Sequence, residues 1–264
     1  MNLKIGYFAD GPWSHKTFDK IIADSEIKIS FICVRYNSED KTLKDYAKQN
    51  NIDYLKHKNV NSKEFISNIA KYNCDLFVSM SFDQIFKTQI INLPKYKAIN
   101  CHAGKLPFYR GRNVLNWALV NGEKYFGIST HLIDKGIDTG KIILRSKYKI
   151  AANDTYETIL KKAHINCPKV LIKTLNLLIS KKKIKYISQK NLKSRKFYYK
   201  KRGKKDEIID LNLSWEKIHN LIRAISYPGP EAKLLFKGKK FKIKSSKKIK
   251  YNKFKFKKKI NFFN

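Results

Sequence analysis

Cysteine is scarce in this sequence of 264 residues, and no two cysteines form a Cys-x-x-Cys pair. The four positions are Cys33, Cys74, Cys101 and Cys167. This spacing supports neither a disulfide framework nor a structural zinc site, and it fits a reducing compartment. We therefore expect a cytoplasmic protein that holds no metal.

Long apolar runs are also missing. No stretch of about 18 apolar residues occurs, so we expect no membrane span. The segment from Met1 to Ala9 lacks the apolar core and the small-residue cleavage site of a signal peptide, and it indicates a first strand instead. Hydrophobic residues still make up 42% of the chain and aromatic residues 13%, which favours a packed core over disorder.

Acidic residues are few, 21 against 57 basic residues, which gives a net charge of +36. Such a charge attracts polyanions, including tRNA, nucleotide diphosphates and polyglutamylated folate. Lysine is spread along the whole chain, however, together with abundant isoleucine, asparagine, tyrosine and phenylalanine. We therefore attribute most of the charge to coding bias, and we expect it to speed association with phosphate-bearing substrates.

The first part of the chain alternates strand patterns with helix patterns. Ser14 is placed to cap a first helix with an apolar face at Phe18, Ile21 and Ile22. This order predicts an α/β fold with a mostly parallel sheet and helices on both faces, and a ligand site at the carboxyl ends of the strands. The predicted strands are 3–8, 27–34, 53–55, 75–80 and 97–102, and the further helices are 42–49 and 62–72.

The later part of the chain predicts two domains, a catalytic one at 1–183 and a small C-terminal one at 184–264, divided at the Lys181–Lys183 run. Asp154 and Glu157 form a capping-box pattern. Lysine alternates with aromatic and aliphatic residues at 239–263, which favours strands over an unstructured RNA-binding tail. The other predicted elements are helices at 114–120, 153–180 and 214–224, strands at 126–133 and 141–148, and a hairpin turn at 236–239.

Asn100 and His102 stand two residues apart at the end of a predicted strand. Side chains alternate across a strand, so both point to one face, at the edge where the ligand crevice is expected. A neutral imidazole, with an ordinary pKa of about 6.5, can take a proton from an attacking amine. An amide can donate a hydrogen bond to a developing oxyanion. The pair therefore suits acyl transfer to nitrogen, although either side chain alone fits a structural role.

Asp138 lies between two glycines in the segment from His131 to Gly140, which indicates a tight loop between strands. Its carboxylate is placed to hydrogen-bond His102, fix the tautomer and stabilise the charged imidazole. The alternative is that Asp138 only stabilises the turn.

Taken together, the patterns Asn-x-His, Leu-Pro-x-Tyr-Arg-Gly and Asp-x-Gly-x-Asp-Thr-Gly within residues 75–145 resemble the folate-dependent formyltransferases. That family acts on methionyl-tRNA, glycinamide ribonucleotide and amino sugars. The resemblance implies a Rossmann-like catalytic domain, and Asn100, His102 and Asp138 as its catalytic trio. One departure is that Gly104-Lys105 replaces the usual Ser-Leu before Leu-Pro, which we expect to affect a loop and not the trio.

The resemblance also implies 10-formyltetrahydrofolate as cosubstrate, bound without a metal. It places the pterin against the backbone near 79–85 and 133–138, although Phe82 and Ile85 also fit core positions. No Gly-x-Gly-x-x-Gly dinucleotide pattern follows the first strand. The candidate cofactor-binding residues are Met80, Phe82, Ile85, Asp134 and Gly136.

Three segments favour a nucleotide-linked amino sugar as the acceptor, most simply a 4-amino-4,6-dideoxyhexose. Residues 10–15 and 109–117 resemble the sugar enzymes, and the chain after about 223 is short for a full tRNA-binding domain. Guanidinium groups and helix N-termini suit phosphates, yet each of these residues also fits a structural role. The candidate substrate-binding residues are Trp13, Ser14, His15, Lys16, Tyr109, Arg110, Arg112, Asn113, Arg223 and Tyr227.

The resulting hypothesis is a sugar N-formyltransferase of O-antigen or other surface-glycan synthesis, and by analogy a homodimer. Methionyl-tRNA formylation is the nearest alternative, with tRNA as the partner in place of the nucleotide sugar. A basic RNA-binding protein with an inactive enzyme fold is an alternative of another class. Hydrolysis of 10-formyltetrahydrofolate is a third.

Overall fold

The computed structural model describes residues 2–180, 184–189, 198–248 and 254–258 of the chain. By their contacts the residues divide into two compact units, each drawn from several stretches of sequence. The predicted domain boundary at 183 lies outside the described residues and stays a prediction. The first unit comprises Met1–Arg110, Gly127–Ser146 and Ala163–Lys196, and the second comprises Gly111–Phe126, Lys147–Lys162 and Phe197–Asn264.

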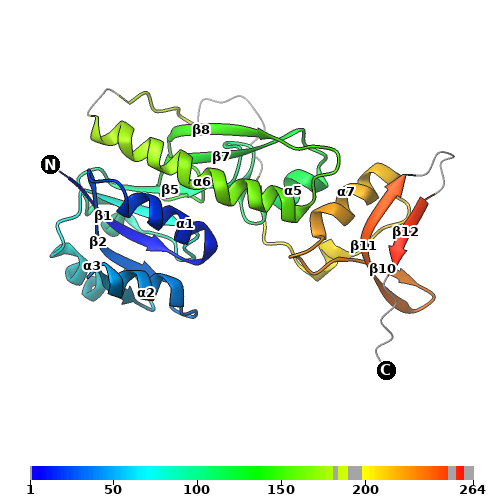
Figure 1. The fold of residues 1–264 in the computed structure, drawn as a ribbon, viewed down its shortest axis with the longest axis horizontal. Helices are drawn as coiled ribbons and strands as arrows, with labels where there is room; N and C mark the ends of the chain where they lie inside the picture. Colours follow the sequence, from blue (N-terminus) through cyan, green and yellow to red (C-terminus); the bar gives the residue numbers. More distant parts are fainter. Residues whose placement is uncertain (1, 181–183, 190–197, 249–253, 259–264) are drawn as a thin grey trace. The chain divides into compact units, whose positions relative to one another are not determined.

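The main sheet has seven strands in the order β3-β2-β1-β4-β5-β7-β8 (Figure 1). The pairs from β3 to β5 are parallel, and β7 joins β5 in the antiparallel direction. The predicted mostly parallel sheet is therefore confirmed. Its strands are β1 (Leu3–Ala9), β2 (Ile27–Val34), β3 (Asp53–Lys56), β4 (Leu76–Met80), β5 (Ala98–His102), β7 (Tyr125–Leu132) and β8 (Ile142–Lys149).

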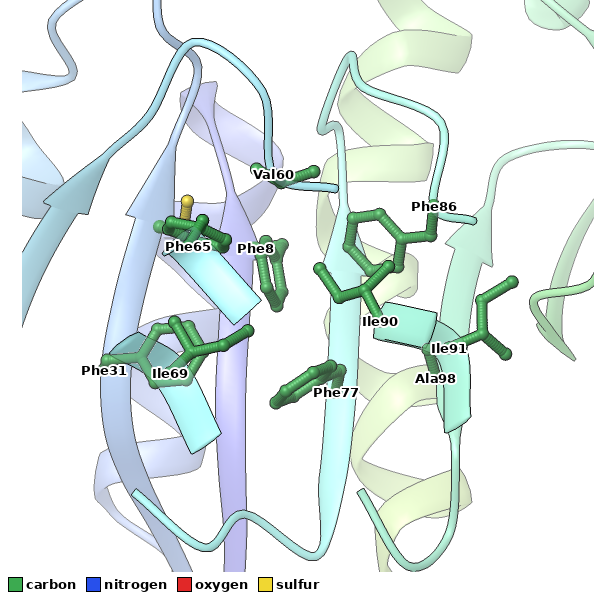
Figure 2. Packing of buried hydrophobic residues seen from close by; sticks show 11 residues of the cluster. Phe8, Phe31, Val60, Phe65, Ile69, Phe77, Phe86, Ile90, Ile91 and Ala98 are labelled. Carbon is green, nitrogen blue, oxygen red and sulfur yellow. The ribbon is translucent and has the colours of Figure 1, made fainter. Parts of the chain in front are cut away.

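One face of the sheet carries an aromatic core. The rings of Phe8 and Phe77 pack edge to face, with centroids 5.2 Å apart, which is a favoured arrangement of aromatic pairs. Helices α3 (Lys63–Ala70) and α4 (Thr88–Asn92) bury Phe65, Ile69, Ile90 and Ile91 in the same cluster. Figure 2 shows these side chains gathered over the strands on this face.

The opposite face is covered by α1 (Gly11–Ile22) and α6 (Tyr156–Ile179). Side chains alternate along β1, so Tyr7 points to this face and Phe8 to the other. The hydroxyl of Tyr7 donates a hydrogen bond to the carbonyl oxygen of Ser14 in α1 at 3.0 Å. Thr130 of β7 contacts Thr174 of α6 through the two hydroxyl oxygens at 2.7 Å. Helices thus lie on both faces of the sheet, as predicted. No helix in the described ranges combines the length and apolar character needed to cross a membrane.

The prediction that Ser14 caps the first helix was wrong. Helix α1 begins at Gly11, directly after Asp10, because Gly11 has a φ of +73° that turns the chain at the end of β1. Pro12 then fits the first turn, where its missing N–H costs nothing. Ser14 lies inside the helix, fully buried, and its hydroxyl donates to the carbonyl of Gly11 at 2.7 Å.

The predicted capping box of α6 was also wrong in its residues. Thr155 and Thr158 make the reciprocal bonds, since each backbone N–H donates to the other's hydroxyl oxygen, at 3.0 and 3.4 Å. Asp154 instead accepts from the backbone N–H of Ala151 at 2.6 Å, and Glu157 pairs with Lys161 at 2.7 Å. The capping box of α6 is therefore formed by Thr155 and Thr158, and not by Asp154 and Glu157.

The second unit contains a small antiparallel sheet, as predicted for the C-terminal part. Ser214 caps α7 by accepting from the N–H of Lys217, and Lys237 and Gly238 form the predicted hairpin turn with positive φ values. The part of the alternating segment at 249–253 and 259–263 lies outside the described residues. The remaining elements are β6 (Arg110–Gly111), which crosses the boundary between the units, and, in the second unit, α5 (Val114–Val120), β9 (Tyr198–Tyr199), a 3-10 turn (Lys204–Glu207), α7 (Trp215–Ile225), β10 (Ala232–Phe236), β11 (Lys239–Lys248) and β12 (Phe254–Lys258).

Asp40 is the N-cap residue of helix α2 (Lys41–Gln49), and its carboxylate also binds two residues of α1. Its carboxylate accepts from the N–H of Leu43 at 3.0 Å, from the N–H of Gly11 at 2.7 Å and from His15 at 2.8 Å. Burial raises the pKa of Asp40, but the bonds from Leu43, Gly11 and His15 outweigh it and lower the pKa below its ordinary value.

Ser62 caps α3 with a single bond, in which its hydroxyl oxygen accepts from the N–H of Phe65 at 3.2 Å. We predict that Asp40→Ala lowers the free energy of unfolding by more than Ser62→Ala, which removes this one capping bond, worth about 1 kcal/mol. Urea unfolding measures both. The Asp40 contribution is present above about pH 4, the ordinary aspartate value, and is lost as the pH falls through the lower folded pKa. Equal losses for the two variants, or a difference that persists in strong acid, would contradict this role.

Candidate active site

The site lies at the carboxyl end of β5, in the first unit. In the register of the sheet Ser79 of β4 lies opposite Asn100, which in turn lies opposite His131 of β7, and His102 lies opposite Ser129. Asn100 and His102 therefore share the face that Ala98 shows to the aromatic cluster, as the alternation predicted. This face changes from apolar to polar where the strand ends.

His102 is held by a backbone carbonyl. Its Nε2 lies 2.6 Å from the carbonyl oxygen of Tyr109, and only 9% of the residue is exposed. A carbonyl only accepts, so Nε2 carries the proton of the neutral ring and the lone pair is on Nδ1. The predicted role of Asp138 in fixing the tautomer by a hydrogen bond was wrong, because the Tyr109 carbonyl does this.

Asp138 nevertheless converges with both predicted partners. Its Oδ2 lies 3.7 Å from Nδ1 of His102, too far for a hydrogen bond but close enough to stabilise a charged imidazole. Its Oδ1 lies 3.5 Å from Nδ2 of Asn100. The amide of Asn100 is only partly buried, and its two contacts, to Asp138 and at 3.4 Å to His131, are long. Its hydrogens thus remain available to another acceptor.

His131 is a site residue that the sequence analysis quoted without assigning it a role. Its Nε2 lies 3.3 Å from Oδ1 of Asp138, and its Nδ1 lies 2.8 Å from the carbonyl oxygen of Leu132. The carboxylate of Asp138 therefore faces two imidazoles, one at each oxygen. His131 joins the site because it lies opposite Asn100 where β7 pairs with β5 in the antiparallel direction. An alternating strand and helix pattern predicts parallel pairing, so it does not reveal this neighbour.

The loop that carries Asp138 is stabilised by its own side chains. Oδ1 of Asp134 accepts from the N–H of Gly136 at 3.1 Å and from the hydroxyl of Thr139. Asp138 itself has a φ of +54°, in the left-handed region that aspartate tolerates better than most residues. Backbone conformations of this kind occur often at functional sites.

Gln189 is a second residue that sequence reasoning missed. Its Nε2 donates to the carbonyls of Asp138 and Gly140, at 3.0 and 2.6 Å, and its Oε1 accepts from Nη2 and Nε of Arg110, at 2.6 and 3.1 Å. Only 2% of Gln189 is exposed. Burial lowers the pKa of Arg110, while the carboxylates of Asp138 and Asp134 raise it. Gln189 thus ties the Asp138 loop to the end of the Leu-Pro-x-Tyr-Arg-Gly segment.

The predicted folate-binding residues lie in different surroundings. Met80 is 1% exposed, and its sulfur contacts the hydroxyl of Thr17 at 3.0 Å, on the α1 face of the sheet. Phe82 packs on the aromatic core, 5.5 Å from the Phe8 ring, whereas Ile85 is exposed. Asp134 and Gly136 are in the Asp138 loop, and a Cβ at Gly136 would meet Thr139. The side chain of Met80 is thus committed to the core, and contact of folate with the others stays a prediction.

The predicted substrate residues of α1 are mostly committed to protein contacts. Trp13 packs edge-on against His164, with ring centroids 4.3 Å apart, and Nε2 of His15 lies 2.8 Å from Asp40. The hydroxyl of Ser14 is buried, so the prediction that it contacts a ligand finds no support in its geometry. Lys16 is exposed.

Four predicted substrate residues belong to the second unit. Arg112 is exposed, and Asn113 accepts the backbone N–H of Arg202 at 3.0 Å. Arg223 donates to the side chain of Asn220 at 2.9 Å and to the carbonyl of Asp154 at 3.1 Å, and burial lowers its pKa. Tyr227 is 68% exposed.

Among the described residues, no three His, Cys, Asp or Glu side chains gather as metal ligands would. The site offers an amide donor and an imidazole base beside a carboxylate. This set can stabilise an oxyanion on a carbonyl carbon and take a proton from an attacking nitrogen, which is what acyl transfer to nitrogen requires.

Two family models match the chain. The one described as formyl transferase matches residues 8–175, and the one described as formyl transferase, C-terminal domain, matches residues 201–256.

Similar sequences include two kinds of protein. The methionyl-tRNA formyltransferase of Clostridium tetani is 35% identical over 76% of this chain and 64% of its own length. The bifunctional polymyxin resistance protein ArnA of Wigglesworthia glossinidia brevipalpis is 35% identical over 78% of this chain and 31% of its own length. The chain thus spans less than two thirds of either relative.

Similar solved structures share the fold. One is a sugar 3N-formyl transferase, WlaRD, crystallised in the presence of dTDP and 5-N-formyl-THF. The two structures match with a TM-score of 0.70 at 24% identity, over 93% of this chain and 86% of the WlaRD chain. A 4-N formyltransferase from Francisella tularensis matches with a TM-score of 0.69 at 21% identity, over 93% of this chain and 98% of that chain. Methionyl-tRNA formyltransferase from Clostridium thermocellum matches with a TM-score of 0.67 at 19% identity, over 98% of this chain and 99% of that chain.

We predict that Gln189→Leu loosens the Asp138 loop and destabilises the chain by about 1–3 kcal/mol, because it leaves buried polar groups unpaired. Hydrogen exchange measured by mass spectrometry should show faster exchange of amides 134–140. Gln84→Leu is the matched control, since Gln84 binds the backbone at His57 and Val60 in the same unit. If exchange of this loop is the same in both variants, Gln189 does not hold it.

Proposed function

We propose, because this chain belongs to the formyl transferase family, that it moves a formyl group from 10-formyltetrahydrofolate to the amine of a nucleotide-linked amino sugar. The observation that carries the proposal is the convergence of Asn100, His102 and Asp138 at the carboxyl edge of the sheet. The folate enters as a substrate, and the protein supplies the proton acceptor and the oxyanion donor.

The first step of the reaction forms a carbon–nitrogen bond. The neutral acceptor amine attacks the formyl carbon, and the carbonyl electron pair moves onto oxygen. The amide of Asn100 donates to this oxyanion, and His102 takes the proton that the attacking nitrogen loses. The carboxylate of Asp138, 3.7 Å from the ring, stabilises the imidazolium that results.

The second step breaks the bond between the formyl carbon and N10 of the folate. The electron pair returns from oxygen to carbon, and His102 gives its proton to N10. The products are the formylated amine and tetrahydrofolate, so atoms and charge balance with no further reactant.

Support for a sugar acceptor comes from the segments around residues 10–15 and 109–117, and from the likeness to a sugar 3N-formyl transferase seen with dTDP. The guanidinium of Arg112, exposed at the start of the second segment, suits a diphosphate. A 4-amino-4,6-dideoxyhexose is the sugar we propose, in the synthesis of a surface glycan. A cytoplasmic homodimer also stays a prediction.

Methionyl-tRNA is the second candidate acceptor. It is favoured by the relatives of that name, by the match to the C-terminal domain model at 201–256 and by the net charge of +36. The coverage of 98% and 99% against the methionyl-tRNA formyltransferase structure points the same way. An inactive RNA-binding protein is disfavoured by the complete trio.

We predict that Asn100→Ala lowers kcat about 100- to 1,000-fold and His102→Ala about 100- to 10,000-fold, with folding retained. Absorbance of released tetrahydrofolate measures turnover, and circular dichroism checks folding. His57→Ala, a histidine of the same unit outside the site, serves as control. Near-full activity in the Asn100 and His102 variants would end the proposed mechanism.

We predict that a panel of nucleotide-linked 4-amino-4,6-dideoxyhexoses contains a substrate, detected as a product heavier by one formyl group. Charged initiator tRNA is assayed in parallel at increasing salt. If only the tRNA is formylated, tRNA replaces the nucleotide sugar as the proposed acceptor. Its turnover should then fall steeply between about 50 and 200 mM salt, as about six to ten phosphate contacts would cause. Tetrahydrofolate release without any acceptor would indicate hydrolysis.

A further inference from the structure

Arg35 lies directly after β2 and reaches the loop that follows β4. Its Nε donates to the carbonyl oxygen of Ser81 at 2.9 Å, and its Nη2 donates to the same oxygen and, at 3.4 Å, to the Ser81 hydroxyl. Strand β1 lies between β2 and β4 in the sheet, and all three strands run in the same direction. The guanidinium therefore spans the carboxyl end of β1 and ties together the ends of its two neighbours.

Ser81 has a backbone conformation that disfavours most residues. Its φ is +61°, in the left-handed region that glycine adopts readily and asparagine and aspartate tolerate. Such conformations persist where surrounding contacts hold them, and they concentrate at functional sites. The bonds from Arg35 to the Ser81 carbonyl are contacts of this kind, so Arg35 fixes the direction in which the chain leaves β4.

The segment fixed in this way begins beside the proposed oxyanion donor. Ser79 of β4 lies opposite Asn100 in the sheet, and Ser81 follows two residues later. The far end of the loop is anchored separately, because Asn61 donates to the carbonyl of Ile85 at 2.9 Å. Loss of the guanidinium would thus release the end of the loop that is nearest the site.

Asp10 departs from the usual role of its residue type. It is the N-cap residue of α1, where an aspartate normally accepts a backbone N–H of the first turn, yet in the described structure its side chain makes no capping bond. Its Oδ2 instead accepts from the hydroxyl of Ser38 at 3.0 Å and lies 3.9 Å from Nε of Arg35. The N–H of Gly11 goes to Asp40. The carboxylate of Asp10 thus pairs with the guanidinium instead of capping the helix, and departures of this kind from a local rule are expected at functional sites.

We propose that Arg35 is a positioning residue for the formyl donor, which holds the backbone from Ser81 onward in the conformation that binds the folate. This role rests on the proposed function. The folate contacts predicted near 79–85 are made by the backbone, so their strength depends on the direction of the chain. In Arg35→Lys the positive charge stays, but the planar fork that donates from two nitrogens to one carbonyl is lost.

The first test needs no acceptor. Calorimetry with 5-formyltetrahydrofolate, a stable isomer of the donor, measures folate affinity, which Arg35→Lys should weaken about tenfold, the equivalent of roughly one hydrogen bond to a charged group. Hydrogen exchange measured by mass spectrometry should show faster exchange of amides 82–84 in the same variant. Asp10→Asn should weaken folate binding about threefold, as the loss of a partly exposed ion pair gives, and should add little to Arg35→Lys in the double variant.

Ser62→Ala is the matched control, because it removes a capping bond to Phe65 in the same unit, away from Ser81. It should leave folate affinity at the wild-type level. Wild-type affinity in Arg35→Lys overturns the proposal, and so does faster exchange without a change in affinity, which would make Arg35 a structural residue alone. If Arg35→Lys does not fold, Asp10→Asn decides, and wild-type affinity in that variant overturns the proposal.

The second test measures turnover with the acceptor that the wild type uses. Arg35→Lys should raise KM for 10-formyltetrahydrofolate about tenfold, with smaller changes in kcat and in KM for the acceptor, because the trio is unchanged. A change confined to kcat or to the acceptor KM overturns the proposal. If the wild type neither binds folate nor transfers formyl, the proposed function fails and the donor role fails with it. If the wild type is active and Arg35→Lys has the same KM for the donor, the function stands and the positioning role fails.

Discussion

The candidate site depends on the antiparallel register between β5 and β7. The parallel strands bring Asn100 and His102 to the carboxyl edge of the sheet, and the reversed strand places His131 and Ser129 directly opposite them. Because side chains alternate with a period of two, a slip by one residue would turn both partners to the α6 face. The same reversal sends the chain from Leu132 into the loop that carries Asp138, which explains how residues so distant in sequence meet.

Close packing beneath the site matters as much as the polar groups themselves. His102 is oriented by a backbone carbonyl, and the Asp138 loop is held by the amide of Gln189, which binds Arg110 at its other end. The contacts of His102 with Tyr109 and of Gln189 with Arg110 are buried, where an unpaired polar group costs more free energy than it would in water. The neighbouring side chains are thus arranged before a substrate arrives, which is the condition for effective oxyanion and proton-transfer catalysis.

The residues proposed to bind the acceptor lie in a different kind of environment. Several predicted substrate contacts are engaged within their own units, such as His15 with the carboxylate of Asp40 and Arg223 with the carbonyl of Asp154. Exposed groups such as Arg112 and Tyr227 remain open to a ligand. A large positive charge adds attraction to any phosphate-bearing acceptor, without distinguishing a nucleotide sugar from a tRNA.

The sequence by itself determined the strand and helix order, the shared face of Asn100 and His102 and the loop around Asp138, because these follow from local periodicity and from motif residues. Only the tertiary structure decided that the Tyr109 carbonyl contacts the ring of His102 and that His131 and Gln189 join the site. These depend on the distance between residues that lie far apart in the chain or fold back over a few residues. Such distances arise from strand register and side-chain packing, which no local pattern encodes.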